Sequence, residues 1–123
     1  MPRWPEFKHM YIIASRSRII YVGSARDLFH RVYQHKTEVF EGFTKKYHCT
    51  RLVYFEKFVT MKGAYDREIK VKGWRREKKI ALINAMNPTW EDLAADWYQA
   101  EKQIPRRAGK NALLGTAPSK EKK

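Results

Sequence analysis

The chain has 123 residues and a formal net charge of +13 at pH 7, from 26 Lys and Arg against 13 Asp and Glu. This length suits one domain with its own core, and the charge favours a polyanionic partner, most simply nucleic acid. The only cysteine, Cys49, excludes an internal disulfide and a cysteine-cluster zinc site, and no apolar run approaches the ~20 residues of a membrane span.

The N-terminal third predicts a lead-in followed by a β-hairpin. Residues 1–8 contain two prolines and lack the apolar core of a signal peptide, so we expect an irregular segment and a cytoplasmic location. Two β-prone runs, residues 11–14 and 19–22, flank the polar turn Ser15-Arg16-Ser17-Arg18, and Gly23 breaks the second run. We expect Tyr11 to lie directly opposite Tyr21, which requires a connection with an odd number of residues.

A helix is predicted from Arg26 to about Lys36, with Ser24 as its cap and Asp27 in the capping-box position. Four residues follow the helical repeat i, i+3, i+4 and i+7, which places a cation and an imidazole at the edge of a buried stripe: Leu28, Arg31, Val32 and His35.

The rest of the chain predicts one more strand and further helices. Residues 37–50 read as a loop turning at Gly42, and residues 51–59 as a third strand. Helices are expected over 61–72, 75–86 and, as a short last element, 90–100. Residues 9–100 would form the domain, and 101–123 a basic, disordered tail. The expected fold class is α/β (α+β), a three-stranded antiparallel sheet flanked by helices.

The ordered set of motifs resembles the GIY-YIG nuclease superfamily, and most closely its small single-domain bacterial members. The resemblance runs from about Met10 to about Leu93, and His9 stands where the family name has its first glycine. The fold that it implies is the one predicted above. Its matching pieces are Tyr11, Tyr21-Val22-Gly23, Arg31, His35, residues 42–47, Glu68, Trp74-Arg75-Arg76 and residues 87–90.

Glu68 interrupts an apolar row on the predicted helix 61–72. A buried carboxylate is costly unless a cation or a hydrogen-bond donor compensates it. A divalent metal would do so, and oxygen ligands suit one Mg²⁺ or Mn²⁺ ion. The alternative is an ion pair with Lys72 at i+4. The resemblance favours Glu68 as the metal ligand.

Tyrosines in strands are mostly packing residues, but Tyr11 and Tyr21 have cationic company in Arg31. We expect that cation, together with a metal-bound phosphate, to favour the phenolate or a strong hydrogen bond to water. The resemblance implies that one tyrosine activates or orients the attacking water, and we assign this role to Tyr11 with Tyr21 as its partner. The Arg31 guanidinium would stabilise the charge that develops on phosphate.

Other candidates have equally good structural explanations. His35 could orient a tyrosine, contact the phosphate, or simply pack at a helix edge. The resemblance also implies a late polar residue, for which Asn87 is the candidate, yet Asn87 could instead cap the helix before Pro88. Phosphate contacts are expected from a basic group that could also be a solvated surface: Lys45, Lys46, Arg75, Arg76, Lys78 and Lys79.

Together these features predict a metal-dependent endonuclease with catalytic residues Tyr11, Tyr21, Arg31, His35 and Glu68. From the resemblance we expect a nucleic-acid substrate, DNA rather than RNA, with structure-specific cleavage and a part in repair or recombination. The rival hypothesis is a non-catalytic nucleic-acid-binding protein on the same scaffold, and a more distant one is a subunit that recruits a nuclease. No membrane partner is expected.

Overall fold

The computed structural model describes residues 7–98 and contains the predicted three-stranded antiparallel sheet. The strand order is β2-β1-β3, with β1 at Lys8–Ala14, β2 at Ile20–Ala25 and β3 at Arg51–Phe58. The helices are α1 (Leu28–Lys36), α2 (Phe43–Lys46), α3 (Met61–Lys72) and α4 (Arg76–Met86). The fold class is thereby confirmed. No helix in this part of the chain is long and apolar enough to cross a membrane.

The chain divides into two compact units, residues 1–93 and residues 94–123. All strands and helices of the described residues belong to the first unit, and residues 94–98 of the second form turns. The helix predicted for 90–100 is therefore wrong over 90–98. Trp90 has a positive φ of 57°, which interrupts any helical run at its start. The tail predicted for 101–123 lies outside the described residues.

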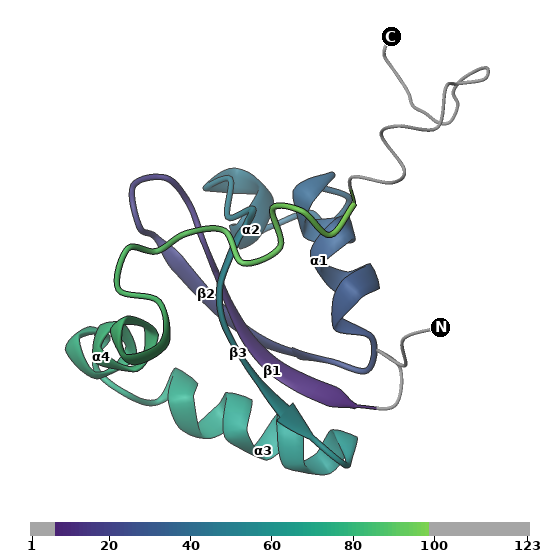
Figure 1. Ribbon diagram of the computed structural model, residues 1–123, viewed down its shortest axis with the longest axis vertical. Coiled ribbons are helices and arrows are strands. Elements are labelled where there is room, and N and C mark those ends of the chain that lie inside the picture. Colours follow the sequence, from purple (N-terminus) through teal and green to yellow (C-terminus); the bar gives the residue numbers. More distant parts are fainter. Residues whose placement is uncertain (1–6, 99–123) are drawn as a thin grey trace, which may run out of the picture. The chain divides into compact units, whose positions relative to one another are not determined.

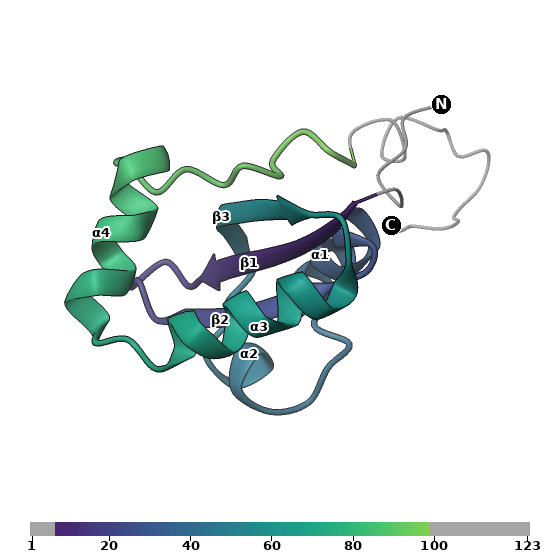
Figure 2. The same cartoon turned by 90° about the horizontal axis from the view of Figure 1, so that it is seen from below.

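The central strand β1 has buried side chains on both faces, because helices cover both sides of the sheet. Met10, Ile12 and Ala14 face α3 and α4 and form the main core with Val71 and Ile83. Tyr11 and Ile13 lie on the other face, which points toward α1. Figure 1 shows α1 on one side of the sheet and α3 and α4 on the other, and Figure 2 shows α3 running along β2 and β1.

The hairpin register differs from the prediction by two residues. Tyr11 lies opposite Gly23, and Tyr21 lies opposite Ile13. The reason is a five-residue connection, Ser15–Ile19, closed by a hydrogen bond from the Ser15 amide to the Ile19 carbonyl at 2.9 Å. A shift by two residues preserves the side-chain alternation, so both phenols still share one face of the sheet. Gly23 does not end the strand, which continues to Ala25.

Two local predictions around the helices also need correction. Asp27 caps α1, because its carboxylate accepts a hydrogen bond from the His30 amide at 3.1 Å, whereas Ser24 lies within β2. Within the segment expected to be a loop, a short helix α2 follows Gly42, whose φ of 105° is available to glycine. The prediction for α3, including its stop at Gly73, is confirmed, whereas β1 begins at Lys8 rather than at residue 11 and α1 begins at Leu28 rather than at Arg26.

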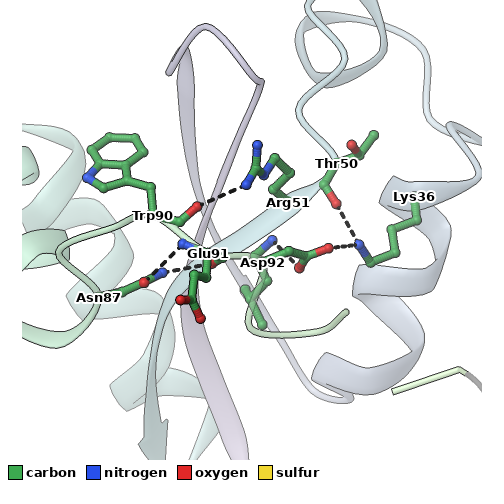
Figure 3. Close-up of polar contacts among 8 residues, drawn as sticks. Lys36, Thr50, Arg51, Asn87, Trp90, Glu91 and Asp92 are labelled. Atoms are coloured by element: carbon green, nitrogen blue, oxygen red, sulfur yellow. Dashed lines mark hydrogen bonds and ion pairs between the residues drawn. The ribbon is translucent and has the colours of Figure 1, made fainter. Parts of the chain in front are cut away.

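The outer edge of β3 is covered by the segment that follows α4. The Leu93 amide donates to the Leu52 carbonyl at 2.7 Å, and the Leu52 amide donates to the Asp92 carboxylate at 3.1 Å. Asp92 also forms an ion pair with Lys36 of α1 (Figure 3). These contacts tie the end of the first unit to both the sheet and α1.

Candidate functional site

Tyr11 stands at the centre of the site, on the middle strand of the sheet. Its side chain is 1% exposed, and its hydroxyl lies 2.8 Å from Nε2 of His35 on α1. Burial raises the pKa of the phenol well above its usual range, and the neighbouring Arg31 guanidinium opposes this only in part. Arg31 thus lowers the pKa of the phenol in the expected direction, but desolvation outweighs its effect. Tyr11 is a neutral hydrogen-bonding group at pH 7.

Gly23 leaves the space that the Tyr11 phenol occupies. The two residues are opposite each other across the β1–β2 pair, and a Cβ atom added to Gly23 would lie 2.6 Å from the Tyr11 hydroxyl oxygen. No real Cβ makes so close a contact. The glycine of the Tyr21-Val22-Gly23 motif is thus needed for the position of the phenol, rather than for a turn.

Tyr21 shares its face of the sheet with Tyr11, and both rings lie beside His35. The Tyr11 and Tyr21 ring centroids are 5.7 Å and 5.9 Å from that of His35. On its other side, Tyr21 approaches the exposed ring of Phe43 at 6.3 Å. The Lys72 ammonium lies 5.3 Å from the Tyr21 ring centroid, so Tyr21 is the phenol with a cation over its ring.

His35 is buried, at 6% exposure. It contacts the Tyr11 hydroxyl, as expected of a residue that orients a tyrosine. Burial and then the charge of Arg31 lower the pKa of His35 to about 4, so the imidazole is neutral at pH 7. Nδ1 of His35 is buried without a hydrogen-bond partner in the described structure. A neutral imidazole has one nitrogen that accepts, which makes Nε2 a possible acceptor for the Tyr11 proton.

Arg31 sits where α1 passes the edge strand β2. Its Nη1 donates to the carbonyl of Ser24 at 3.4 Å, and its guanidinium lies 5.6 Å from the ring of Phe40. It lowers the pKa values of both Tyr11 and His35, which places a cation beside both groups. The arrangement leaves most of its five N–H donors for an anion.

Glu68 approaches the same place from the opposite face of the sheet. Its carboxylate accepts a hydrogen bond from the Ser24 hydroxyl at 2.5 Å and pairs with Lys72 at 2.7 Å. Ser24 therefore links the two halves of the site, since its carbonyl contacts Arg31 and its hydroxyl contacts Glu68. Arg31 and Glu68 thus both contact Ser24, and the charge of Glu68 also raises the pKa of the Tyr11 phenol. They meet around the edge of β2.

The residues around Glu68 fit a metal ion that needs only one protein carboxylate. Within the described residues no group of three or more His, Cys, Asp or Glu side chains gathers to form a preformed cage. Mg²⁺ commonly uses one or two carboxylates and completes its shell with water and substrate phosphate. Glu68 is 8% exposed, and its partner Lys72 is nearly half-exposed and can move aside. A one-carboxylate site is thus compatible with these residues, and the expected Lys72 ion pair is present as well.

An open pocket of about 320 Å³ brings four of the predicted residues together. Tyr11, Tyr21, Arg31 and His35 line it, along with aromatic residues that sequence reasoning did not select, Phe40 and Phe43. Ser24 was also missed in its role, since it was assigned to a helix cap. Ser24 follows Val22 by two residues on an edge strand, so its side chain lies on the same face of the sheet as that of Val22, the face covered by α3. This alternation was the sequence signal for its role.

The predicted basic residues fall into two groups. Lys45 and Lys46 lie on α2, whose first residue, Phe43, lines the pocket. Lys46 lies 5.3 Å from the ring of Tyr47. The others belong to the start of α4 or to the residue just before it: Arg75, Arg76, Lys78 and Lys79.

Trp74, which precedes that second group, has two cations close to its ring. The Arg67 guanidinium is 5.1 Å from its ring centroid and the Lys78 ammonium is 4.2 Å away. Arg67 is also held by two hydrogen bonds to the Glu56 carboxylate, both 3.0 Å long. Lys78 carries no such ion pair among the described residues, so its charge is available at the surface.

Asn87 does not line the tyrosine pocket, and its side chain is used to build the loop after α4 (Figure 3). Its amide nitrogen donates to the carbonyls of Val53 and Glu91 at 3.1 Å and 2.8 Å, and its oxygen accepts from the Glu91 amide at 3.0 Å. Val53 is the extra residue of β3 opposite the step from Ile12 to Ile13. These bonds support the structural explanation of Asn87.

Comparisons with known proteins agree with this architecture. A family model described as the GIY-YIG catalytic domain matches residues 7–81. The UPF0213 protein SSP2268 of Staphylococcus saprophyticus is 33% identical over 76 residues, which cover 62% of this chain and 93% of that protein. The UPF0213 protein HQ_3675A of Haloquadratum walsbyi is 31% identical over 77 residues, or 63% and 86% of the two chains.

A further relative is the UPF0213 protein SA0446 of Staphylococcus aureus, strain N315. It is 34% identical over 74 residues, which cover 60% of this chain and 90% of that protein. No solved structure gives a significant match.

Proposed function

The chain belongs to the GIY-YIG catalytic-domain family, and we propose from this membership that it is an endonuclease that hydrolyses phosphodiester bonds in nucleic acid with one divalent metal ion. The observation that carries the proposal is the single pocket lined by Tyr11, Tyr21, Arg31 and His35. Glu68 joins it through one residue, Ser24. Polar residues that only stabilised the fold would not require an open pocket beside them, whereas residues that bind a substrate would.

In this proposal Tyr11 and His35 handle the proton of the attacking water. Tyr11 stays protonated at neutral pH, so its hydroxyl oxygen can accept a hydrogen bond from water while its own proton points to Nε2 of His35. The 2.8 Å separation allows His35 to take the phenol proton as Tyr11 takes one from the water. The low pKa of His35 keeps this nitrogen unprotonated before the reaction begins.

Arg31 would bind the phosphate and stabilise the negative charge that builds up as the water attacks. Its planar fork of donors suits two phosphate oxygens at once. Glu68 would hold Mg²⁺ or Mn²⁺, which when bound polarises the phosphate and stabilises the leaving oxygen. Ser24 orients the Glu68 carboxylate through the 2.5 Å hydrogen bond.

The finer properties of the substrate follow from the family resemblance alone. DNA rather than RNA, and a part in repair or recombination, stay predictions. The basic residues of α2 and α4 support binding to a phosphate backbone, but they carry no information on sequence.

The rival function, a non-catalytic nucleic-acid-binding protein, has one observation in its favour. The Glu68–Lys72 ion pair already compensates the buried carboxylate without a metal. A cleavage assay separates the two functions. The protein is incubated with branched, nicked, duplex and single-stranded DNA and RNA, with Mg²⁺, Mn²⁺ or EDTA. The endonuclease cleaves at least one substrate in the presence of metal and none in EDTA, whereas binding without cleavage in every condition supports the rival.

A further inference from the structure

A second, smaller pocket of about 100 Å³ lies at the hairpin end of the sheet and is lined by three arginines. Arg16 and Arg18 come from the connection between β1 and β2, and Arg51 begins β3. Ala14, Thr89 and Trp90 complete much of its wall, and the lining within residues 7–98 contains no Asp or Glu. The tyrosine pocket shares none of these residues.

Two of the arginines are held in place by the same loop. The Arg18 guanidinium lies 4.6 Å from the ring centroid of Trp90, and Nη2 of Arg51 donates to the Trp90 carbonyl at 3.3 Å. Both Arg18 and Trp90 have positive φ angles, 70° and 57°, so the backbone of each loop is locally constrained. Stacking and a single hydrogen bond fix these guanidinium groups but leave most of their N–H donors unused.

The three arginines of the cluster form no ion pair with another described residue. None of the ion pairs formed by residues 7–98 involves Arg16, Arg18 or Arg51. A fourth arginine, Arg76 at the start of α4, donates to the Arg18 carbonyl at 2.7 Å and adds a further positive charge. Like charges held together repel one another, and an anion between them would remove that repulsion.

We propose that Arg16, Arg18 and Arg51 form a binding site for one backbone phosphate of the nucleic-acid strand whose scissile phosphate occupies the tyrosine pocket. This inference rests on the proposed function. Along β1, Ala14 lies three residues beyond Tyr11, a distance of about 10 Å. This separation exceeds the rise of one nucleotide of B-form DNA, about 3.4 Å along the helix axis, so the site holds a phosphate other than the one that is cut.

The size of the pocket decides between one shared phosphate and several separate contacts. Three guanidinium groups around about 100 Å³ can surround one phosphate but not three. Neutralising one phosphate of duplex DNA contributes about 0.9 to the slope of log affinity against log salt. We compare three variants: Arg16→Gln, Arg16→Gln/Arg18→Gln, and the triple variant that adds Arg51→Gln. If one phosphate is shared, the salt-dependence slope should fall by no more than about 0.9 in any of them. Independent contacts would cost the triple variant roughly 2.7.

The test measures duplex binding by fluorescence anisotropy at several salt concentrations, in EDTA so that no cleavage occurs. The control Lys57→Gln/Lys62→Gln removes two exposed charges at the opposite end of the sheet. In this variant the arginine pocket should still make its full contribution to the slope of log affinity against log salt. The variant Arg16→Lys/Arg18→Lys keeps the charge and should retain most of that contribution. Circular dichroism checks that each variant is folded. Because Arg16 is exposed, Arg16→Gln alone should stay folded and keeps the test valid if the triple variant unfolds.

Position is tested with duplexes that carry one neutral methylphosphonate at successive sites. The parent protein should lose affinity when the neutral group stands at one site distinct from the cleavage position, and the Arg16→Gln/Arg18→Gln variant should not respond to that change. The inference is overturned if the parent binds nucleic acid and the arginine variants match it in slope and in methylphosphonate profile. If the parent binds no nucleic acid at all, the proposed function itself fails.

Discussion

The hydroxyl of Tyr11 lies above the Cα atom of Gly23, so close that an added Cβ would come within 2.6 Å of it. We therefore expect Gly23→Ala to displace the phenol from His35 and to abolish cleavage. Overpacking of this kind costs about 1–3 kcal/mol of stability. Thermal unfolding and a cleavage assay check both effects. Combining Gly23→Ala with Tyr11→Leu should recover much of the stability and none of the activity, whereas simple additivity of the two losses would contradict this account.

The buried His35 makes the stability of the protein depend on pH. Its pKa falls from 6.5 in the unfolded chain to about 4 in the folded protein. Between these values the unfolded chain binds a proton that the folded protein does not. The His35 contribution to stability is therefore complete above pH 6.5 and is lost as the pH falls toward 4, a change of about 3 kcal/mol. Urea unfolding at a series of pH values measures it.

The matched variant for that experiment is His35→Leu, which cannot titrate. It should be less stable than the parent at pH 7, because Tyr11 loses its hydrogen-bond partner, but its stability should change less between pH 6.5 and 4. Part of the dependence should remain, since burial also lowers the pKa of His9. Equal slopes for parent and variant would show that His35 is not the titrating group.

Replacing Glu68 by Gln should abolish cleavage and any rise in melting temperature caused by Mg²⁺ or Mn²⁺, because the charge that holds the metal is gone. Nucleic-acid binding should change little. The lost ion pair with the half-exposed Lys72 should cost at most about 1 kcal/mol. Asp66→Asn, on an exposed turn of the same helix, is the matched control and should keep both cleavage and the metal effect. Normal cleavage by Glu68→Gln would rule out the metal role.

Asn87 should prove to be important for stability rather than for catalysis. Removing its side chain leaves the Val53 carbonyl and the Glu91 amide without their partners, and buried unsatisfied groups cost about 1–3 kcal/mol each. We expect Asn87→Ala to lower the free energy of unfolding by about 2–3 kcal/mol, measured in urea. Its cleavage rate per folded molecule, measured at low temperature, should equal that of the parent. A fully stable but inactive variant would restore Asn87 to the active site.

The two tyrosines should differ in their contribution to the rate. Tyr11→Phe removes the hydroxyl that bonds His35, whereas Tyr21→Phe keeps the ring that lies between His35, Phe43 and Lys72. We expect Tyr11→Phe to reduce kcat by a factor of about 100 or more and Tyr21→Phe to have a smaller effect. Single-turnover kinetics with saturating enzyme make the comparison. A larger loss for Tyr21→Phe would reverse the roles assigned to the two phenols.

The sequence predicted the strands and long helices because alternation and helical spacing are local properties. Residues 61–72 matched α3 at both ends, since Thr60 and Gly73 provide local start and stop signals. The hairpin register depended on the length of one connection, and two residues more than assumed moved Tyr11 from Tyr21 to Gly23. Side-chain alternation tolerates such a shift, which is why the shared face was still predicted correctly.

Local patterns predicted the parts of the site that lie on one helix or one hairpin, and the family resemblance supplied the rest. Arg31 and His35 lie on one helix, so their common edge followed from spacing. The meeting of Arg31 with Glu68 depends on how α1 and α3 pass the two sides of β2, which no local pattern encodes. The same holds for the loop at Trp90, whose positive φ is stabilised by contacts with Arg18 and Arg51 that are distant in sequence.

The sheet treats its two outer strands differently, and this has a consequence for inhibition and aggregation. The edge of β3 is covered by residues 87–93, whereas β2 has no strand neighbour on its outer side among the described residues. An uncovered edge is a template on which an extended peptide can add as a further strand. A peptide bound along β2 would crowd Arg31 at Ser24 and block the site without entering its pocket. The accessibility that catalysis would need therefore also exposes the protein to self-association through that strand.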